Sequence, residues 1–186
     1  MDIGKVYLER HGFDGIFRSS YELLTTECVG NVFGHTSHKK SGDIWVIESA
    51  LPIQRVRRTS KDICIGSDKV LHRSRLALSN VPIGDYHSHI LFNEKKGKKI
   101  DTYLPVISLS EEDKEDLKEW GNNISLIMAL KETPRITRLG NNPFLLTGHI
   151  RDNGSIYRIE IGAFYYNGRM RKALIKADKK VLDSIR

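Results

Sequence analysis

The sequence has no long hydrophobic run. Its apolar stretches fall short of the ~20 residues that a membrane-spanning helix needs. The first five residues, Met1 to Lys5, also lack the basic stretch and apolar block of a secretory signal. Hydrophobic residues make up 39% of the chain and charged residues 28%, as in ordinary globular domains. These features predict a soluble, cytoplasmic protein that does not associate with membranes.

Cysteine is scarce, and internal repeats and low-complexity tracts are absent. Cys28 and Cys64 can form at most one disulfide, and in a reducing compartment they are better interpreted as small core residues. A chain of 186 residues can bury a substantial core without dividing into two units. We therefore expect one domain spanning residues 1–186.

Positive charge is in excess, with a formal net charge of +7. The Lys and Arg clusters lie at residues 55–58, 95–99 and 169–172. They lack the interleaved aromatic residues on which nucleic-acid bases stack. The sequence therefore favours a solvated basic surface over a nucleic-acid-binding domain, although charge alone keeps the second reading open.

The hydrophobic patterns predict several strands and a few helices. Strands are expected at 28–35 and 43–56, joined as a hairpin, at 81–86 and at 123–130, followed by a hairpin of 144–151 and 155–166 turned by Asp152-Asn153-Gly154. Helices are expected at 67–78, from Ser110 to about Gly121, and from about Arg171 to Ile185. This order predicts an α/β domain with a curved, mostly antiparallel sheet flanked by helices.

The motif His87-Ser88-His89 carries the first sign of chemistry. Side chains in an extended strand alternate with period two, so both imidazoles point to one side and can reach a single ion. A catalytic zinc site typically has three protein ligands and an open fourth position. Asp113 is the natural third ligand, because Ser110 and Asp113 share one face of the helix that begins at Ser110. We therefore expect one Zn²⁺ bound by His87, His89 and Asp113.

A carboxylate is also needed to accept a proton from the water that such a metal acidifies. Glu48 is the sequence's first candidate for this general acid/base, because a charged residue among the apolar neighbours of a strand is costly without a partner. Glu27 is the rival. Its place just before the first of these strands also suits a simple loop hydrogen bond, so the sequence favours Glu48.

These residues together resemble the JAMM (MPN-plus) metallopeptidases, in the form of the prokaryotic JAB domain. The likeness spans about Glu27 to Leu130 and includes the glycine-bearing strand that starts at Glu27 and the strand Ile83–His89 that leads into the metal motif. The resemblance implies a JAMM-like, cytidine-deaminase-like core. It implies zinc on His87, His89 and Asp113, with Glu48 as acid/base and Ser110 stabilising the oxyanion.

By the same resemblance, the reaction is hydrolysis of an amide or isopeptide bond at the C-terminal tail of a ubiquitin-like or sulfur-carrier protein. A deconjugase of a bacterial antiviral system is one possibility within that class. The sequence departs from the family at Asp85, where an aromatic residue is usual, and at Ile90, where proline is usual. A lysine-rich insertion at about residues 90–105 is either a solvated loop or a flap that contacts substrate.

Simpler interpretations exist for each residue taken singly. Ser110 has a complete structural explanation as a helix N-cap, and Asp113 has one as an acid at the positive end of the helix dipole. Cys64, His72 and His149 stand alone in the sequence and are not expected to be ligands. The main alternative function is a non-catalytic MPN-like interaction module on the same scaffold. Retention of the full ligand set argues against it.

Overall fold

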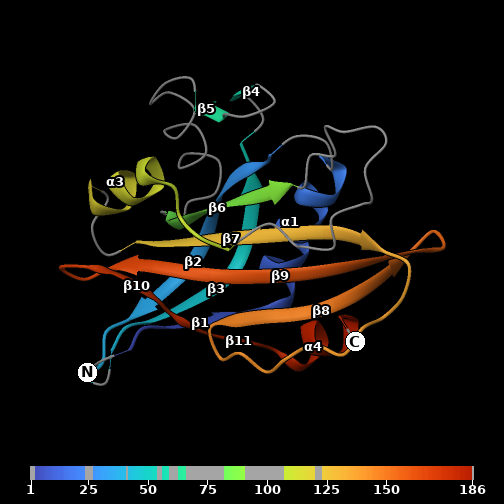
Figure 1. The fold of residues 1–186 in the computed structure, drawn as a ribbon. Helices are drawn as coiled ribbons and strands as arrows, with labels where there is room; N and C mark the ends of the chain where they lie inside the picture. Colours follow the sequence, from blue (N-terminus) through green and yellow to red (C-terminus); the bar gives the residue numbers. More distant parts are fainter. Residues whose placement is uncertain are drawn as a thin grey trace.

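The computed structural model describes residues 3–23, 27–40, 42–53, 56–58, 63–65, 82–90, 107–119 and 123–185 (Figure 1). Its helices are α1 (Arg10–Glu22), α3 (Glu111–Glu119) and α4 (Lys179–Ser184). The strands are β1 (Lys5–Leu8), β2 (Val29–Ser37), β3 (Ile44–Pro52), β4 (Val56–Arg58), β5 (Ile63–Ile65), β6 (Pro82–Ile90), β7 (Ile124–Thr133), β8 (Leu145–Asp152), β9 (Ser155–Tyr166), β10 (Met170–Lys172) and β11 (Leu174–Ala177).

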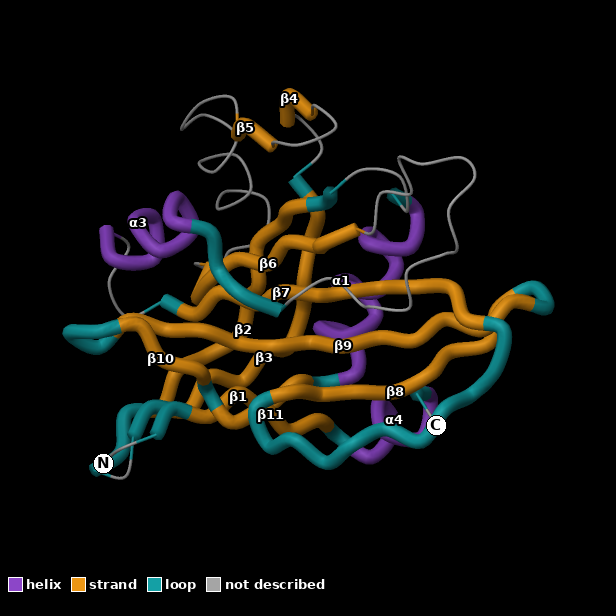
Figure 2. The backbone as a smooth tube through the Cα atoms, in the orientation of Figure 1, coloured by secondary structure: helices purple, strands orange, loops and turns teal. Residues whose placement is uncertain are grey.

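One nine-stranded sheet contains all of these strands except β4 and β5, which pair with each other. Its order is β10-β9-β7-β6-β2-β3-β1-β11, and β8 pairs with the outer part of β9. Most neighbours are antiparallel, but β1 is parallel to both β3 and β11, and β6 is parallel to β7. The last strand, β11, returns to lie against β8 and β9, so the sheet nearly closes on itself (Figure 2).

The main core lies between the sheet and α1, on what we name the α1 face. Phe13 and Ile16 of α1 are fully buried against strand residues such as Trp45 and Leu126. The helix sits unusually close to β3. A Cβ atom added to Gly12 would stand 2.7 Å from the carbonyl oxygen of Ile47, and one added to Gly15 would stand 2.2 Å from that of Ala50. Glycine is therefore required at the contact.

The opposite side of the sheet, the α3 face, carries a smaller core. Leu117 of α3 and Leu109 of the preceding segment pack on Ile127 and Ala129 of β7 and on Phe164 of β9. The two cores use alternate residues of the same strand, because Leu126 and Met128 point to the α1 face. This small core fixes the start of α3 above β6 and β7 (Figure 1).

Most of the expected strands are confirmed. The strand expected at 28–35 is β2, and it forms the expected hairpin with β3. The strands expected at 81–86 and 123–130 extend to Ile90 and Thr133 as β6 and β7. The hairpin of β8 and β9 turns at Asn153 and Gly154, both with positive φ (47° and 85°). The mostly antiparallel mixed α/β sheet flanked by helices is thus as predicted.

Two parts of the fold differ from expectation. The C-terminal helix expected over 171–185 is wrong, because residues up to Ala177 form β10 and β11 and only Lys179–Ser184 is helical. Leu174–Ala177 pairs in parallel with β1, a strand that the sequence pattern did not reveal, and that pairing overrides the local preference. The strand expected over 43–56 ends at Pro52.

Several expectations lie outside the described residues. They are the helix at 67–78, most of the insertion at 90–105, and the end of the Ser110 helix near Gly121. Cys28 is buried and free, as expected of a core cysteine. In the ranges that the structure describes, no helix has both the length and the apolar character needed to cross a membrane.

Candidate metal centre

The candidate centre lies on β6, whose side chains alternate between the two faces of the sheet. Tyr86 and Ser88 point to the α1 face, where both are fully buried. His87 and His89 point to the α3 face, beside Ile127 and Ala129 of the parallel strand β7. The period-two geometry expected from His-x-His is therefore the one the strand adopts.

The two histidines are close enough to share one ion. The distance from Nε2 of His87 to Nε2 of His89 is 3.2 Å. Zinc–nitrogen bonds of ~2.0–2.1 Å in a tetrahedral site place two ligand nitrogens about 3.3 Å apart. The observed separation matches that spacing. It also suits a direct hydrogen bond if one ring nitrogen carries the proton.

Asp113 approaches the same point from the first turn of α3. Its Oδ2 atom is 3.8 Å from Nε2 of His87, slightly longer than the spacing between two ligands of one zinc ion. Among the described residues, no three His, Cys, Asp or Glu side chains are placed so that they could hold a metal ion together as they stand. Asp113 would have to move closer for all three donors to share one ion, while two imidazoles and one carboxylate are by type a donor set that suits zinc.

Ser110 and Asp113 hold each other as a capping box. The backbone N–H of Asp113 donates to Oγ of Ser110 (3.1 Å), while the backbone N–H of Ser110 donates to Oδ2 of Asp113 (2.8 Å). The Ser110 hydroxyl also donates to that Oδ2 atom, at 2.7 Å. The helix cap and the candidate ligand are therefore one arrangement, and the cap fixes the carboxylate near His87.

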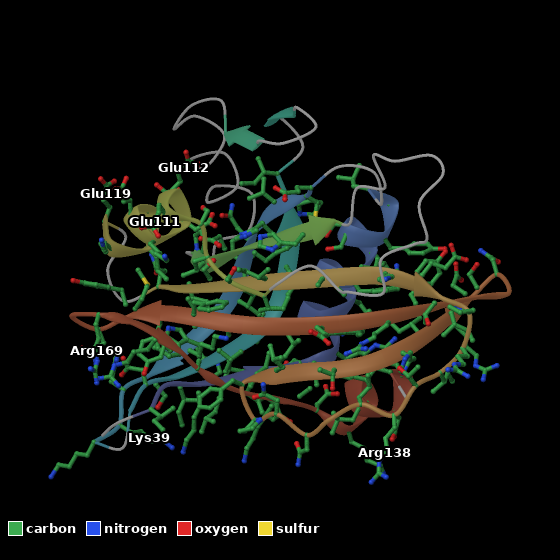
Figure 3. All side chains as sticks on the ribbon, viewed as in Figure 1. Lys39, Glu111, Glu112, Glu119, Arg138 and Arg169 are labelled. Carbon is green, nitrogen blue, oxygen red and sulfur yellow. The ribbon has the colours of Figure 1, made fainter. Side chains whose placement is uncertain are left out.

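Three other acidic residues of α3 face solvent. Glu111, Glu112 and Glu119 are exposed, and Figure 3 shows Glu112 and Glu119 extending away from the sheet. The Asp113 side chain, by contrast, is only 30% exposed. Asp113 is thus less exposed than these three acidic neighbours.

The electrostatic environment keeps His87 and Asp113 in the protonation states that bind a metal ion. Burial lowers the pKa of His87 to about 4, against a smaller opposing effect of Asp113. Burial also raises the pKa of Asp113, but His87 and the hydrogen bonds from Ser110 outweigh it, so the net shift is downward. A neutral imidazole and an ionised carboxylate at neutral pH are the forms that coordinate zinc.

Glu48 is not brought to this centre. It lies at an irregularity in the pairing of β3 with β2, and its carboxylate Oε1 bonds Nδ1 of His35 at 2.8 Å on an exposed surface. The neighbouring Phe33 of β2 pairs with Pro82 of β6, five residues before His87. That separation is roughly 16 Å along a strand, beyond the reach of a glutamate side chain. The structure therefore does not place Glu48 near the histidines.

Glu27 lies just before β2, next to the point where Cys28 bonds Ser88 of β6. Val29 pairs with His87, and the backbone N–H of Ser88 donates to the carbonyl oxygen of Cys28 at 2.9 Å. Continued one step beyond the last paired residues, this antiparallel direction would bring Glu27 opposite His89. The signal was present in the sequence, since Glu27 opens the glycine-bearing strand. The hydrophobic pattern around Glu48 outweighed it because strand order is not readable from one sequence.

A polar row crosses three strands beside the histidines. Asn31 of β2 pairs with Asp85 of β6, which pairs with Ser125 of β7. Asn31 and Ser125 are buried, and the Ser125 hydroxyl donates to Oδ1 of Asp85 at 2.7 Å. Burial raises the pKa of Asp85 to about 7, while the bond from Ser125 opposes that shift. Asp85, the middle residue of this row, stands at the position where the resemblance leads one to expect an aromatic residue.

Comparison with known proteins supports the fold only. The chain matches no protein-family model and no curated protein. It is similar in structure to the solution structure of protein DSY2949 from Desulfitobacterium hafniense, with a TM-score of 0.52 and 12% sequence identity. The similarity covers 93% of this chain and 92% of that one. A likeness at this identity concerns architecture, and it gives the metal centre no chemistry.

Proposed function

We propose that this protein is a zinc-dependent metallopeptidase of the JAMM type. The observation that carries the proposal is the proximity of three candidate ligands on the α3 face. The Nε2 atoms of His87 and His89 lie 3.2 Å apart, and the Oδ2 atom of Asp113 lies 3.8 Å from His87. Two imidazoles and one carboxylate are a usual ligand set for catalytic zinc.

The arrangement of elements supports a JAMM-like core. The parallel strands β6 and β7 flank α3 in sequence, with His-x-His on β6 and Ser-x-x-Asp at the start of α3. The glycine-bearing strand β2 lies on the other side of β6, and Glu27 lies two residues before its start. His-x-His and Ser-x-x-Asp stand where the resemblance puts the ligands. The resemblance puts the acid/base on Glu48 of β3, and the sheet order favours Glu27 in its place.

The residues divide the work of amide hydrolysis among them. A zinc ion held by His87, His89 and Asp113 would polarise the scissile carbonyl and acidify a water molecule. Glu27, opposite His89, is proposed as the general base that accepts the proton of the water and returns it to the leaving nitrogen. Ser110 is proposed to donate a hydrogen bond to the carbonyl oxygen as negative charge develops there.

The Ser110 role requires a change of partner. In the structure the Ser110 hydroxyl donates to Oδ2 of Asp113, and its Oγ atom accepts from the Asp113 N–H. Rotation of the hydroxyl hydrogen frees it for substrate without disturbing the cap. The backbone N–H of Ser110 keeps Asp113 in place meanwhile, so one residue can serve both helix and substrate.

The proposed substrate is a ubiquitin-like or sulfur-carrier protein whose flexible C-terminal tail ends in an amide or isopeptide bond. An extended tail suits a centre at the C-terminal part of a strand, beside the start of a helix. The choice of a ubiquitin-like or a sulfur-carrier protein as the substrate rests on the resemblance alone. No membrane partner is proposed, and nucleic acid is not the proposed substrate.

The experiment combines metal analysis with cleavage of a ubiquitin-like conjugate. The parent is expected to hold about one zinc per chain. His89→Ala is expected to lose the metal and the activity. Glu27→Gln is expected to retain the metal while kcat falls about 100-fold or more, because general acid–base catalysis contributes on the order of 10²–10⁴.

Glu48→Gln is the matched control, since it makes the same chemical change on a neighbouring strand. Its zinc content and kcat are expected to stay within about twofold of the parent. Absence of stoichiometric zinc from the parent would contradict the metallopeptidase proposal. A loss of kcat in Glu48→Gln but not in Glu27→Gln would restore Glu48 as the base and remove Glu27 from that role.

A further inference from the structure

A second set of polar groups lies on the α1 face, directly behind the candidate ligands. Ser88 lies between His87 and His89 in the strand, but its side chain points to the α1 face, and the residue is only 1% exposed. Cys28 and Ser20 are buried with it, and their Sγ and Oγ atoms are 3.3 Å apart. Burying a hydroxyl group costs free energy unless it is hydrogen-bonded. The hydrogen-bond partners of Ser88 therefore show which part of the backbone its hydroxyl holds in place.

Ser88 is joined to Cys28 by two hydrogen bonds of different kinds. The Ser88 N–H donates to the carbonyl oxygen of Cys28 at 2.9 Å, as in a regular ladder. The Cys28 N–H donates to the side-chain Oγ of Ser88, also at 2.9 Å. In a regular antiparallel pair that second bond would go to a backbone carbonyl. The side chain of Ser88 thus ends the ladder at the residue that follows Glu27.

The start of β2 is held from both sides at this point. On the side opposite Ser88, the backbone N–H of Ile53 donates to the carbonyl oxygen of Val29 at 2.9 Å. With Cys28 and Val29 both fixed, the backbone next to Glu27 has little freedom to slide along β6. The position of Glu27 relative to His89 therefore depends directly on the Ser88 hydroxyl.

We infer that Ser88 is a positioning residue, whose hydroxyl fixes the backbone of Cys28 so that Glu27 stands opposite His89. This inference rests on the proposed function, in which Glu27 is the general base. Ser88 touches neither ligand-side atoms nor substrate, because it lies on the opposite face of the strand. It acts through geometry, and a misplacement of about 1 Å in a catalytic group can lower the rate on the order of 100-fold.

Three variants test the inference. Ser88→Ala removes the acceptor for the Cys28 N–H, and Ser88→Thr keeps a hydroxyl at the same position. Tyr86→Phe is the matched control, because Tyr86 lies on the same strand and face and its hydroxyl bonds Ser19 at 2.7 Å, away from Glu27. Each protein is assayed for zinc content, for kcat and KM on a ubiquitin-like conjugate, and for hydrogen exchange at the Cys28 amide.

Ser88→Ala is expected to keep its zinc and its KM within about twofold, to lose about 10- to 100-fold in kcat, and to exchange the Cys28 amide much faster. Ser88→Thr is expected to restore both kcat and protection, and Tyr86→Phe to change neither. Equal kcat in Ser88→Ala and Tyr86→Phe at equal zinc content would overturn the inference. So would loss of zinc from Ser88→Ala, since Ser88 would then act on the ligands.

The exchange measurement separates this inference from the proposed function. If the parent hydrolyses nothing, the metallopeptidase proposal fails whatever Ser88 does. If the Cys28 amide exchanges at the same rate in Ser88→Ala and the parent, the contact that fixes Glu27 is absent and the positioning role fails, whatever the parent's activity.

Discussion

At the scale of single residues, the candidate ligands were accessible from sequence and the proposed base, Glu27, was not. His87 and His89 follow from strand periodicity, and Asp113 follows from its spacing to Ser110 on a helix. These are local geometries that neighbouring residues impose. The placement of Glu27 depends on which strand lies next to β6, which is a long-range property. Glu48 has the more suggestive local pattern, but its strand, β3, is separated from β6 by β2.

Asp85 gives a pH-dependent prediction for the metal-free protein. Its pKa is about 7 in the folded state and ~3.9 in an unfolded chain. Between these values the folded state binds the proton more tightly, so this group's contribution to stability falls as pH rises from about 4 to 7. Asp85→Asn is neutral throughout and can still accept from Ser125. It should therefore be more stable than the parent at pH 8, by about 1–3 kcal/mol.

Urea unfolding in the presence of a chelator at pH 5, 6, 7 and 8 measures this difference. The gap between Asp85→Asn and the parent is expected to widen with pH and to level off above pH 8. Glu119→Gln removes one charge from the exposed surface of α3 and should follow the parent's pH dependence. A gap that stays constant over this pH range would contradict the assignment of a raised pKa to Asp85.

At the scale of elements, errors arose where tertiary contacts override local preference. The sequence Arg10–Glu22 contains Gly12 and Gly15, which disfavour a helix in isolation. The close contact of α1 with β3 requires these two residues to lack a Cβ atom. Strands that pair locally, such as the β8–β9 hairpin, were predictable because the turn Asn153-Gly154 encodes the pairing itself.

One side chain caps two helices and gives a prediction about their stability. The carboxylate of Asp178 accepts from the N–H of Val181 in α4 (2.8 Å) and from the N–H of Arg10 in α1 (2.9 Å). Glu9, the residue before α1, makes no side-chain cap of its own. Asp178→Ala should lower the free energy of unfolding by about 1–3 kcal/mol, since one N-cap is worth ~1 kcal/mol and two amides lose their acceptor.

Thermal or urea unfolding measures the loss, and amide exchange locates it. Asp178→Asn keeps one acceptor oxygen and should fall between the parent and the alanine variant. Lys179→Ala alters the exposed neighbouring residue and should remain within about 0.5 kcal/mol of the parent. If Asp178→Ala left exchange at Arg10 unchanged, the shared cap would not be the source of any destabilisation.

At the scale of the whole molecule, the sheet separates the large hydrophobic core from the candidate metal centre. The α1 face holds the large core, in which α1 and α4 pack on the strands. The α3 face holds a small core whose principal effect is to fix the start of α3 above β6. The sheet order that makes this division could not be predicted from sequence, because it depends on the parallel pairings of β1 with β3 and β11.

This division predicts that two chemically identical core truncations have different effects on the metal. Leu117 is 2% exposed in the small core, and Leu126 is fully buried in the large one. Replacing either leucine with alanine should reduce stability by about 2–5 kcal/mol. Only Leu117→Ala loosens the helix that carries Asp113, so only this variant should bind zinc more weakly, by about 10-fold or more.

Zinc affinity measured by competition with a chelator under folding conditions tests the difference, and urea unfolding of the metal-free proteins provides the stability baseline. Because a ligand that binds only the folded state raises its stability by mass action, saturating zinc should stabilise the parent and Leu126→Ala equally. It should stabilise Leu117→Ala less. Equal zinc affinity in the two variants would mean that Asp113 is held by its cap with Ser110 alone, and that packing of α3 on the sheet does not control the metal centre.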